Sequence, residues 1–330
     1  MRYWTKSKIN QKNQSMKSVD VLNICTEDWA NFMLDHHKAL KSVGIDSAAI
    51  KLVEHPWYLK NQAAVVSQRD MIQYCKNARI IQIFHSDEKL LNLLLFNAIK
   101  KPIIVYHTGS KYRAGYNVLN RHFNILPVKK NVMCLPDIWN LGLERQVYMV
   151  GAVDTDKNVC ENHFIKKPYE FAHYPSNAEV KGTNRIIKAL HKAKEESLDM
   201  FSYIVDTTSV ESTEAIERMK SCDVYIELFK PRLKGRPYGA FGITCLEAAS
   251  LGKIVVTQNL NNQLYVNHYG ENPLQLFSTG KELRSIIKNL ASLSEYEMRA
   301  LQEATRNWIV DKHSYKATGE YILKNILNGL

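Results

Sequence analysis

Short apolar runs alternate with amphipathic segments along most of the chain, as expected for strands and helices in turn. In the first half the predicted strands are residues 19–25, 48–51, 80–84 and 102–106, and the predicted helices are residues 29–43, 67–77 and 90–99. In the second half the predicted strands are residues 147–154, 169–173, 201–205, 223–226 and 254–256, and the predicted helices are residues 184–194, 212–220, 242–251, 283–293, 294–310 and 315–327. Strands that alternate with helices favour parallel sheets built from βαβ units, so the pattern predicts an α/β fold.

The chain length of 330 residues suits two domains better than one core. Apolar residues make up 45% and charged residues 23%, which is ordinary for a globular protein. The predicted divisions are a basic lead-in over residues 1–18, an N-terminal Rossmann-like domain over 19–150, a linker over 151–166, a C-terminal domain over 167–312 and a final helical segment over 313–330.

The net charge of +11 lies almost entirely in the first half of the chain. Residues 1–150 contain 21 Lys and Arg against 11 Asp and Glu, whereas residues 151–330 contain 23 against 22. Such an excess attracts an acidic partner, which is nucleic acid, an anionic membrane surface or a phosphorylated substrate. A solvated, lysine-rich surface without a partner is the alternative.

The cysteines and the apolar runs indicate an intracellular chain. Six cysteines are scattered without a C-x-x-C pair, so reduced core thiols are expected rather than disulfides or zinc ligands. The apolar runs are shorter than the ~20 residues that cross a bilayer. The first eighteen residues lack the apolar core of a secretory signal. We therefore expect a cytoplasmic protein, with peripheral binding to a membrane surface as an open option.

Polar residues follow several predicted strands of the first half. His85 follows the strand 80–84, His107 follows the strand 102–106, and Asp28 lies just after the strand 19–25. Ligands gather at the carboxyl ends of parallel strands, so these three residues are candidate catalytic groups. A Gly-x-Gly-x-x-Gly fingerprint is absent, which disfavours a dinucleotide-dependent dehydrogenase. No group of residues has metal-ligand spacing, and no metal is predicted.

The stretch from Cys222 to Thr257 predicts a strand, a loop, a helix that begins at Gly242, and a second strand. The loop contains Pro231, Gly235 and Pro237, so no regular element is expected in it. A strand followed by a glycine turn and a helix N-terminus is a site for anions, because free backbone N–H groups and the helix dipole point the same way.

The same stretch resembles the nucleotide-sugar-binding half of GT-B glycosyltransferases, in particular the large retaining family four. The family pattern is Glu-Gly-Phe-Gly, four residues, then Glu-Ala-x-Ala-x-Gly-x-Pro-Val. Here Gly239-Ala240-Phe241-Gly242 is followed by Glu247-Ala248-Ala249-Ser250-Leu251-Gly252. Glu247 matches the second glutamate of the family's Glu-x7-Glu pair, and Gly239 stands in place of the first.

Two further segments resemble the same family. Residues 147–154 are similar to its interdomain segment, so the Asp154-Thr155-Asp156 triplet is interpreted as linker rather than as a metal motif. Lys181-Gly182, placed before the helix 184–194, resembles the family's opening motif, in which a lysine contacts the donor pyrophosphate. The family's last helix often crosses back to the first domain, so residues 313–330 are expected to do the same.

The resemblance implies two Rossmann-like domains that face each other across a cleft, and a hexosyltransferase-like enzyme. Such an enzyme moves a sugar from a nucleoside diphosphate sugar to a hydroxyl, with retention and without a metal or other cofactor. The donor-binding candidates are Lys181, Glu247, Phe241, Gly242, Ile243, Gly239, Ser176, Asn177, Glu227, Lys230 and Arg232. The basic first domain suggests an anionic acceptor, which is a modified nucleic acid, a lipid phosphate or a membrane glycolipid.

Two other functions remain open at this point. One is a non-catalytic GT-B-like module that binds nucleotide sugar or polyanion, for which Gly239 is the argument. The other is a nucleic-acid-binding protein, for which the charge of the first half is the argument.

Overall fold

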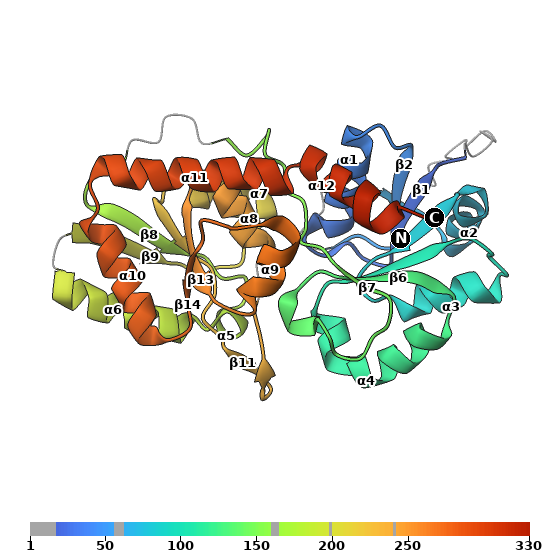
Figure 1. Ribbon diagram of the computed structural model, residues 1–330, viewed down its shortest axis with the longest axis horizontal. Coiled ribbons are helices and arrows are strands. Elements are labelled where there is room, and N and C mark those ends of the chain that lie inside the picture. The colour runs from blue at the N-terminus through green and yellow to red at the C-terminus, as the bar shows by residue number, and fades with distance from the viewer. Residues whose placement is uncertain (1–17, 56–62, 160–164, 198–199, 240–241) are drawn as a thin grey trace, which may run out of the picture.

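The computed structural model describes residues 18–55, 63–159, 165–197, 200–239 and 242–330. These residues form two α/β domains that lie side by side (Figure 1). Each domain contains a parallel sheet with helices packed on it, so the predicted α/β architecture with two Rossmann-like sheets is confirmed. In the described residues no helix combines the length and the apolar character that crossing a bilayer requires.

The first domain is built on a seven-stranded parallel sheet with the order β3-β2-β1-β4-β5-β6-β7. Its strands are β1 (Val21–Cys25), β2 (Ser47–Lys51), β3 (Ala64–Val65), β4 (Ile80–Ile83), β5 (Ile103–His107), β6 (Val128–Met133) and β7 (Gln146–Tyr148). Valine and isoleucine dominate the central strands β4 and β5, because residues there are covered on both faces.

Two layers of helices cover this sheet. Helices α2 (Gln68–Asn77), α3 (Glu88–Phe96) and α4 (Ser110–Ile125) share one apolar core with the sheet. Helix α1 (Phe32–Ser42), entered through the 3-10 turn Trp29–Asn31, shares a second core with the end of the chain. Strands β4, β5 and β6 follow one another across the sheet, and right-handed crossovers therefore place α3 and α4 next to each other on one face.

The second domain has a five-stranded parallel sheet with the order β14-β13-β10-β8-β9. Its strands are β8 (Tyr169–His173), β9 (Phe201–Val205), β10 (Val224–Ile226), β13 (Ile254–Gln258) and β14 (Gln275–Phe277). Its helices are α5 (Ala178–Lys181), α6 (Thr183–Ser197), α7 (Ser212–Lys220), α8 (Ile243–Ser250), α9 (Asn262–Tyr269), α10 (Gly280–Ser292) and α11 (Glu295–His313).

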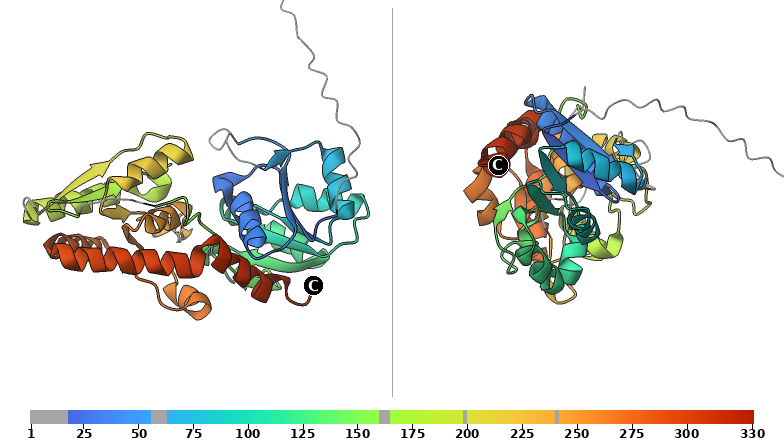
Figure 2. Two further views of the ribbon diagram at one scale, coloured as in Figure 1. Left: turned by 90° about the horizontal axis from the view of Figure 1, so that it is seen from above. Right: turned by 90° about the vertical axis from the view of Figure 1, so that its right-hand side faces the viewer.

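The end of the chain joins the two domains (Figure 2). Helix α11 runs along the second domain, and α12 (Tyr315–Ile322), with the π-helical turn Leu323–Leu327, packs on α1 of the first domain. A Cβ at Gly319 would lie 2.3 Å from the carbonyl oxygen of Ala39, so only glycine permits this approach. The Tyr321 hydroxyl donates to the carbonyl of Tyr148, 2.8 Å away, which ties α12 to the end of β7.

The structure corrects several local predictions. Strands β3, β6 and β14 and helices α5 and α9 were not predicted, and the strand expected over residues 147–154 ends at Tyr148. Helix α1 begins at Phe32 rather than at residue 29, because Ala30 and Asn31 have positive φ. Helix α4 was not predicted. The loop before α8 contains a short hairpin, β11 (Arg232–Leu233) and β12 (Arg236–Pro237), whose two turn residues have positive φ as a tight hairpin turn requires.

Candidate functional site in the interdomain cleft

The carboxyl ends of strands from both sheets border one cavity of about 200 Å³ between the domains. This is where ligands bind in open α/β sheets, because helix N-termini and loop side chains converge there. The wall from the first domain includes Trp29, Phe32, His85, Thr108, Arg113 and Leu135. The wall from the second domain includes Lys181, Glu227, Leu228, Tyr238, Gly239, Gly242 and Ile243.

A buried ion pair occupies the second-domain wall. The Lys181 ammonium donates to Oε1 of Glu227, and the Thr244 hydroxyl donates to Oε2 of the same carboxylate at 2.6 Å. The Glu227 side chain is fully buried, so it requires these partners. Burial disfavours the charge of Lys181, but the Glu227 carboxylate outweighs this and raises the pKa of Lys181. The cavity therefore keeps a permanent cation on its wall.

Helix α8 begins beside this pair. Its N-cap, Gly242, offers no side chain to the first backbone N–H groups. A Cβ at Gly242 would lie 2.5 Å from Oε1 of Glu227, so glycine is needed for the carboxylate to reach this point. The free N–H groups and the positive end of the helix dipole add to the charge of Lys181. Phe241, another predicted donor-binding residue, lies outside the described residues.

Gly239 has a structural reason for being glycine. Its φ of +118° is unfavourable for any other residue, and a Cβ there would lie 2.0 Å from Nε2 of Gln258. That amide group donates to the carbonyls of Lys230 and Tyr238, which anchors both ends of the hairpin β11–β12. A glutamate at position 239 does not fit this arrangement.

Glu247 lies one turn into α8 and not on the cavity wall. Burial raises the pKa of Glu247 to about 8, and the negative charges of Asp35 and Glu227 act in the same direction. Asp35 belongs to α1 of the first domain, so these two carboxyl groups lie near each other across the interdomain junction. The Tyr315 hydroxyl donates to Oδ1 of Asp35 at 2.7 Å and lies 3.4 Å from Oδ2 of Asp154. Burial raises the pKa of Asp35 to about 7.

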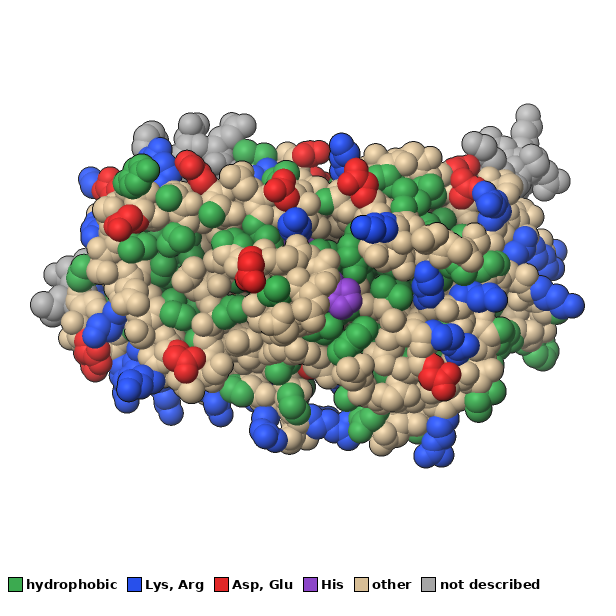
Figure 3. All heavy atoms as spheres, viewed as in Figure 1, with side chains coloured by type: hydrophobic (Ala, Val, Ile, Leu, Met, Phe, Trp, Pro, Cys, Tyr) green, Lys and Arg blue, Asp and Glu red, His purple; other side chains and the backbone are tan. Residues whose placement is uncertain are grey.

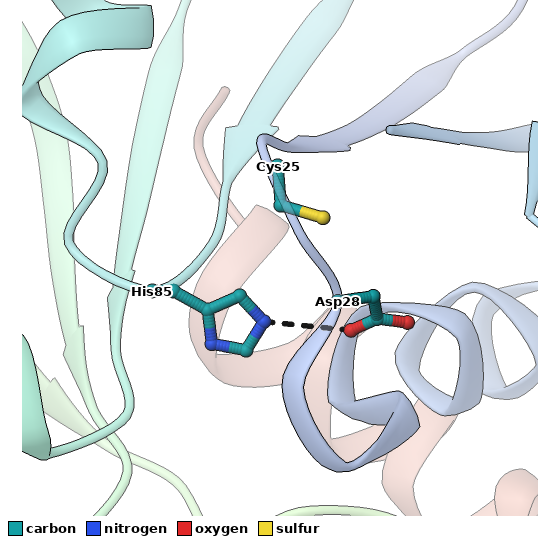
Figure 4. Close-up of side chains that lie close together, drawn as sticks. All are labelled: Cys25, Asp28 and His85. Atoms are coloured by element: carbon teal, nitrogen blue, oxygen red, sulfur yellow. Dashed lines mark hydrogen bonds and ion pairs between the residues drawn. The ribbon is translucent and has the colours of Figure 1, made fainter. Parts of the chain in front are cut away.

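His85 is the predicted catalytic histidine that the structure places on the cavity wall. Its Nδ1 lies 2.7 Å from the Thr108 hydroxyl, and its Nε2 lies 3.4 Å from Oδ1 of Asp28 (Figure 4). The His85 backbone has a φ of +62°, an unfavourable conformation for a residue other than glycine that is often retained at functional sites. Thr108 also lines the cavity, so a hydrogen-bonded chain leads from a buried carboxylate to the ligand space.

Cys25 completes a group of three potential metal ligands with Asp28 and His85, whose ligand atoms lie within 4.8 Å of one another (Figure 4). Burial and the nearby Asp28 charge raise the pKa of the Cys25 thiol well above its usual range, so it is a poor metal ligand. Asp28 accepts the backbone N–H groups of Met33 and Leu34, which start helix α1. These contacts explain the cluster as part of the fold, and we assign no metal to it.

His107 lies in the core rather than in the cavity. It is fully buried, and its ring nitrogens pair with the Ser86 hydroxyl at 2.9 Å and with Oδ1 of Asn131 at 3.1 Å. Burial lowers the pKa of His107 to about 4, so the ring is neutral. A side chain with both nitrogens engaged and no exposed surface has no access to a ligand.

Four other predicted donor residues lie away from the cavity wall. The Asn177 side chain accepts the N–H of Val180 and so caps the short helix α5, and Ser176 is exposed beside it. Arg232 is exposed on β11 and donates to the carbonyl of Gly235, and Lys230 precedes that strand.

The sequence did not indicate a contact that crosses the cleft. Arg113 of α4 makes a bidentate ion pair with the buried Asp137, and its guanidinium lies 4.7 Å from the centre of the Tyr238 ring. Both Arg113 and Tyr238 line the cavity. They are 125 positions apart in the sequence, and no local pattern connects an arginine in a helix with a tyrosine after a hairpin.

Comparisons with known proteins identify the fold. No protein-family model matches the chain, and no curated protein matches it in sequence. Among solved structures, HepE from Anabaena in complex with UDP-glucose has a TM-score of 0.65 at 11% identity, covering 94% of this chain and 100% of that one. The chain has the GT-B fold.

Two other solved structures agree with this. A glycosyltransferase from Rickettsia africae has a TM-score of 0.61 at 13% identity, with 93% of this chain and 97% of that one covered. An alpha-glucosyltransferase in complex with UDP-glucose and DNA containing an abasic site has a TM-score of 0.64 at 12% identity, with coverage of 94% and 99%. At such identities the agreement concerns the fold, and the function is argued from the site.

We predict that the junction carboxyl groups make the protein less stable as the pH rises. Asp35 has a pKa of about 7 in the folded chain and an ordinary value of 3.8, so between these values the folded state binds a proton that the unfolded state lacks. The free energy of unfolding must then decrease with rising pH. The free energy of unfolding measured in urea should be lower at pH 8 than at pH 5. Asp35→Asn should reduce this difference by roughly 2 to 3 kcal/mol. The exposed control Glu196→Gln should leave this difference between pH 5 and pH 8 unchanged. If Asp35→Asn also left the difference unchanged, its assignment to Asp35 would be contradicted.

Proposed function

We propose that this chain is a glycosyltransferase that moves a sugar from a nucleoside diphosphate sugar to a hydroxyl group. The observation that carries the proposal is the Lys181–Glu227 ion pair beside the uncapped N-terminus of α8, on the wall of the interdomain cavity. A diphosphate needs a fixed cation and free N–H groups, and a sugar needs carboxylate acceptors for its hydroxyls. Both are present within one cavity of a GT-B fold.

Each part of the donor has a candidate partner. Lys181 and the N–H groups that follow Gly242 bind the diphosphate. Glu247, one turn further along α8, lies off the cavity wall, and its assignment to the ribose hydroxyls rests on the resemblance to family four alone. Glu227 is the candidate for the sugar hydroxyls, because Gly239 has no side chain to offer.

The acceptor side is formed by the first domain. His85, oriented by Asp28, is the candidate base. The Thr108 hydroxyl, which is hydrogen-bonded to Nδ1 of His85, takes the proton of the acceptor hydroxyl and passes its own proton to that nitrogen. Arg113 stabilises negative charge on the leaving diphosphate, which is the electrostatic help that a metal-independent transfer requires. The resemblance to the retaining family supports retention of the anomeric configuration and transfer without a metal. HepE and the alpha-glucosyltransferase are in complex with UDP-glucose, which makes this the first donor to test.

Diphosphate binding should depend on Lys181. In a thermal-shift panel of uridine, guanosine, adenosine and cytidine diphosphates, we expect at least one nucleotide to raise the melting temperature. Lys181→Ala should weaken the affinity for that nucleotide by about tenfold or more, since a charge-assisted hydrogen bond to phosphate contributes roughly 1.5–3 kcal/mol. The matched control is Lys188→Ala, an exposed lysine on α6, which should bind like the unaltered chain. Stabilisation by none of the four nucleotides would overturn the donor site.

Glu227 should distinguish the nucleotide sugar from the nucleotide. Glu227→Gln keeps the size of the side chain but removes the charge that holds sugar hydroxyls. We expect the ratio of the Kd for UDP-glucose to the Kd for UDP to rise by about tenfold. Isothermal titration with both ligands measures this ratio. An unchanged ratio would show that Glu227 only positions Lys181.

Turnover separates an enzyme from a binding module. Incubation with UDP-glucose and a hydroxyl acceptor in the presence of EDTA should release UDP, and proton NMR of the glycosylated product should show the α-anomer of the donor retained. We expect His85→Ala to lower kcat by about a hundredfold or more, in the range of general base catalysis. Binding without release of UDP for every acceptor tested would favour the non-catalytic module. Release that stops with EDTA or an inverted product would contradict the proposed chemistry.

A further inference from the structure

The positive charge of the described first domain is concentrated between residues 68 and 130. Residues 68–130, which include α2, α3 and α4, contain 11 Lys and Arg against 3 Asp and Glu, a difference of 11 − 3 = +8. Of the acids, Asp87 is buried and accepts the N–H of Leu90, and Glu88 pairs with Lys111 at 2.7 Å. In Figure 3 the end of the molecule formed by the first domain shows more Lys and Arg side chains than Asp and Glu.

Large apolar side chains are exposed on the same layer. Phe96, at the end of α3, is 91% exposed, and Val118 and Ile125 of α4 are 70% and 84% exposed. Val118, Arg121 and Ile125 follow the i, i+3, i+7 spacing, so they form one stripe along the outer face of α4. Lys89 and Lys100, exposed on and after α3, flank Phe96 in the sequence. We call this surface of α3 and α4 the apolar-basic face.

The apolar-basic face belongs to one continuous layer. Helices α3 and α4 pack on the same side of the sheet and share its core, as Figure 1 shows. Helix α4 itself contains no acidic residue. Arg121 accompanies the outward-pointing apolar groups of α4, whereas Lys111 and Arg113 of the same helix are paired with Glu88 and Asp137.

The basic surface continues across the mouth of the cleft. The guanidinium of Arg236, on β12 of the second domain, lies 4.6 Å from the centre of the Tyr116 ring of α4. Arg232, Lys234 and Arg236 are all exposed on this hairpin. The cavity and the apolar-basic face consequently share helix α4, from which Arg113 lines the cavity and Val118 points outward.

We propose that the apolar-basic face docks on the surface of an anionic lipid bilayer. Lys and Arg are attracted to anionic headgroups, and Phe96, Val118 and Ile125 enter the boundary of the acyl region. Two of these three side chains, Val118 and Ile125, have no aromatic face on which a base can stack, which favours lipid over nucleic acid as the occupant.

The N-terminal segment of the chain does not cover this face by charge attraction. Residues 1–17 contain five Lys and Arg and no acidic residue, so their charge repels it. The docking needs neither donor nor catalysis, and it stands apart from the proposed transferase activity.

Vesicle sedimentation of the full chain, without nucleotide, tests the proposal. The protein should sediment with vesicles of phosphatidylcholine and phosphatidylglycerol and stay in solution with phosphatidylcholine alone. The double variant Lys100→Gln, Arg121→Gln should lose about fivefold in partition coefficient per charge. The double variant Val118→Ser, Ile125→Ser should lose roughly tenfold. Tyr296→Ser, which removes an 82% exposed aromatic residue from α11 of the second domain, is the matched control and should bind normally.

The possible results separate the alternatives. All of these positions are exposed, so thermal unfolding should be unchanged and a loss of binding is not a loss of folding. Equal sedimentation of both double variants and the control would overturn the proposal. Binding of duplex DNA that the charge variant loses and the serine variant keeps, without binding of vesicles, would also overturn it and assign the face to nucleic acid. Because the donor site is not involved, Lys181→Ala should bind vesicles normally whether or not the transferase proposal holds.

Discussion

The packing of the last helix on the first domain is the constraint on which the site depends. Helix α12 reaches α1 because Gly319 lets the two backbones approach, and Tyr315 and Tyr321 tie it to both the junction and the end of β7. Parallel strands have all their carboxyl ends at one edge of a sheet. Holding the two domains in this orientation makes both edges face the same cavity. Contacts such as that between Arg113 and Tyr238 exist only because of this orientation.

Charge in the cleft follows a consistent arrangement. Lys181 and Thr244 bind both oxygens of Glu227 at the cavity wall, and breaking such a buried pair costs about 3–5 kcal/mol. Glu247 has a pKa of about 8 and is mostly neutral near pH 7, so it carries little negative charge that would repel a diphosphate. Asp35, with a pKa of about 7, is then about half ionised. The same carboxyl groups make the junction sensitive to pH.

The proposed lipid-binding surface and the proposed donor site lie on opposite faces of one helix. Arg113 of α4 borders the cavity, and Val118 and Ile125 of α4 point away from the protein. The hairpin β11–β12 adds further positive charge where the two domains meet. An acceptor that belongs to a bilayer surface would reach the cleft from this side, which connects the charge of the first domain with the direction of transfer.

The sequence by itself determined the α/β class, the central strands of both sheets and most of the helices, and it indicated the positions of the proposed anion site. Runs such as Ile103–His107 and the Lys181-Gly182 and Gly242 positions are local signals, because burial of a strand and the start of a helix depend on neighbouring residues. Only the tertiary structure decided which strand-end residues face the ligand space. His85 and His107 have the same sequence context, but one lines the cavity and the other pairs with Ser86 and Asn131 in the core. The hairpin, the crowding of Gly239 by Gln258 and the Arg113–Tyr238 contact likewise depend on residues distant in the chain, whose approach is set by packing and not by local pattern.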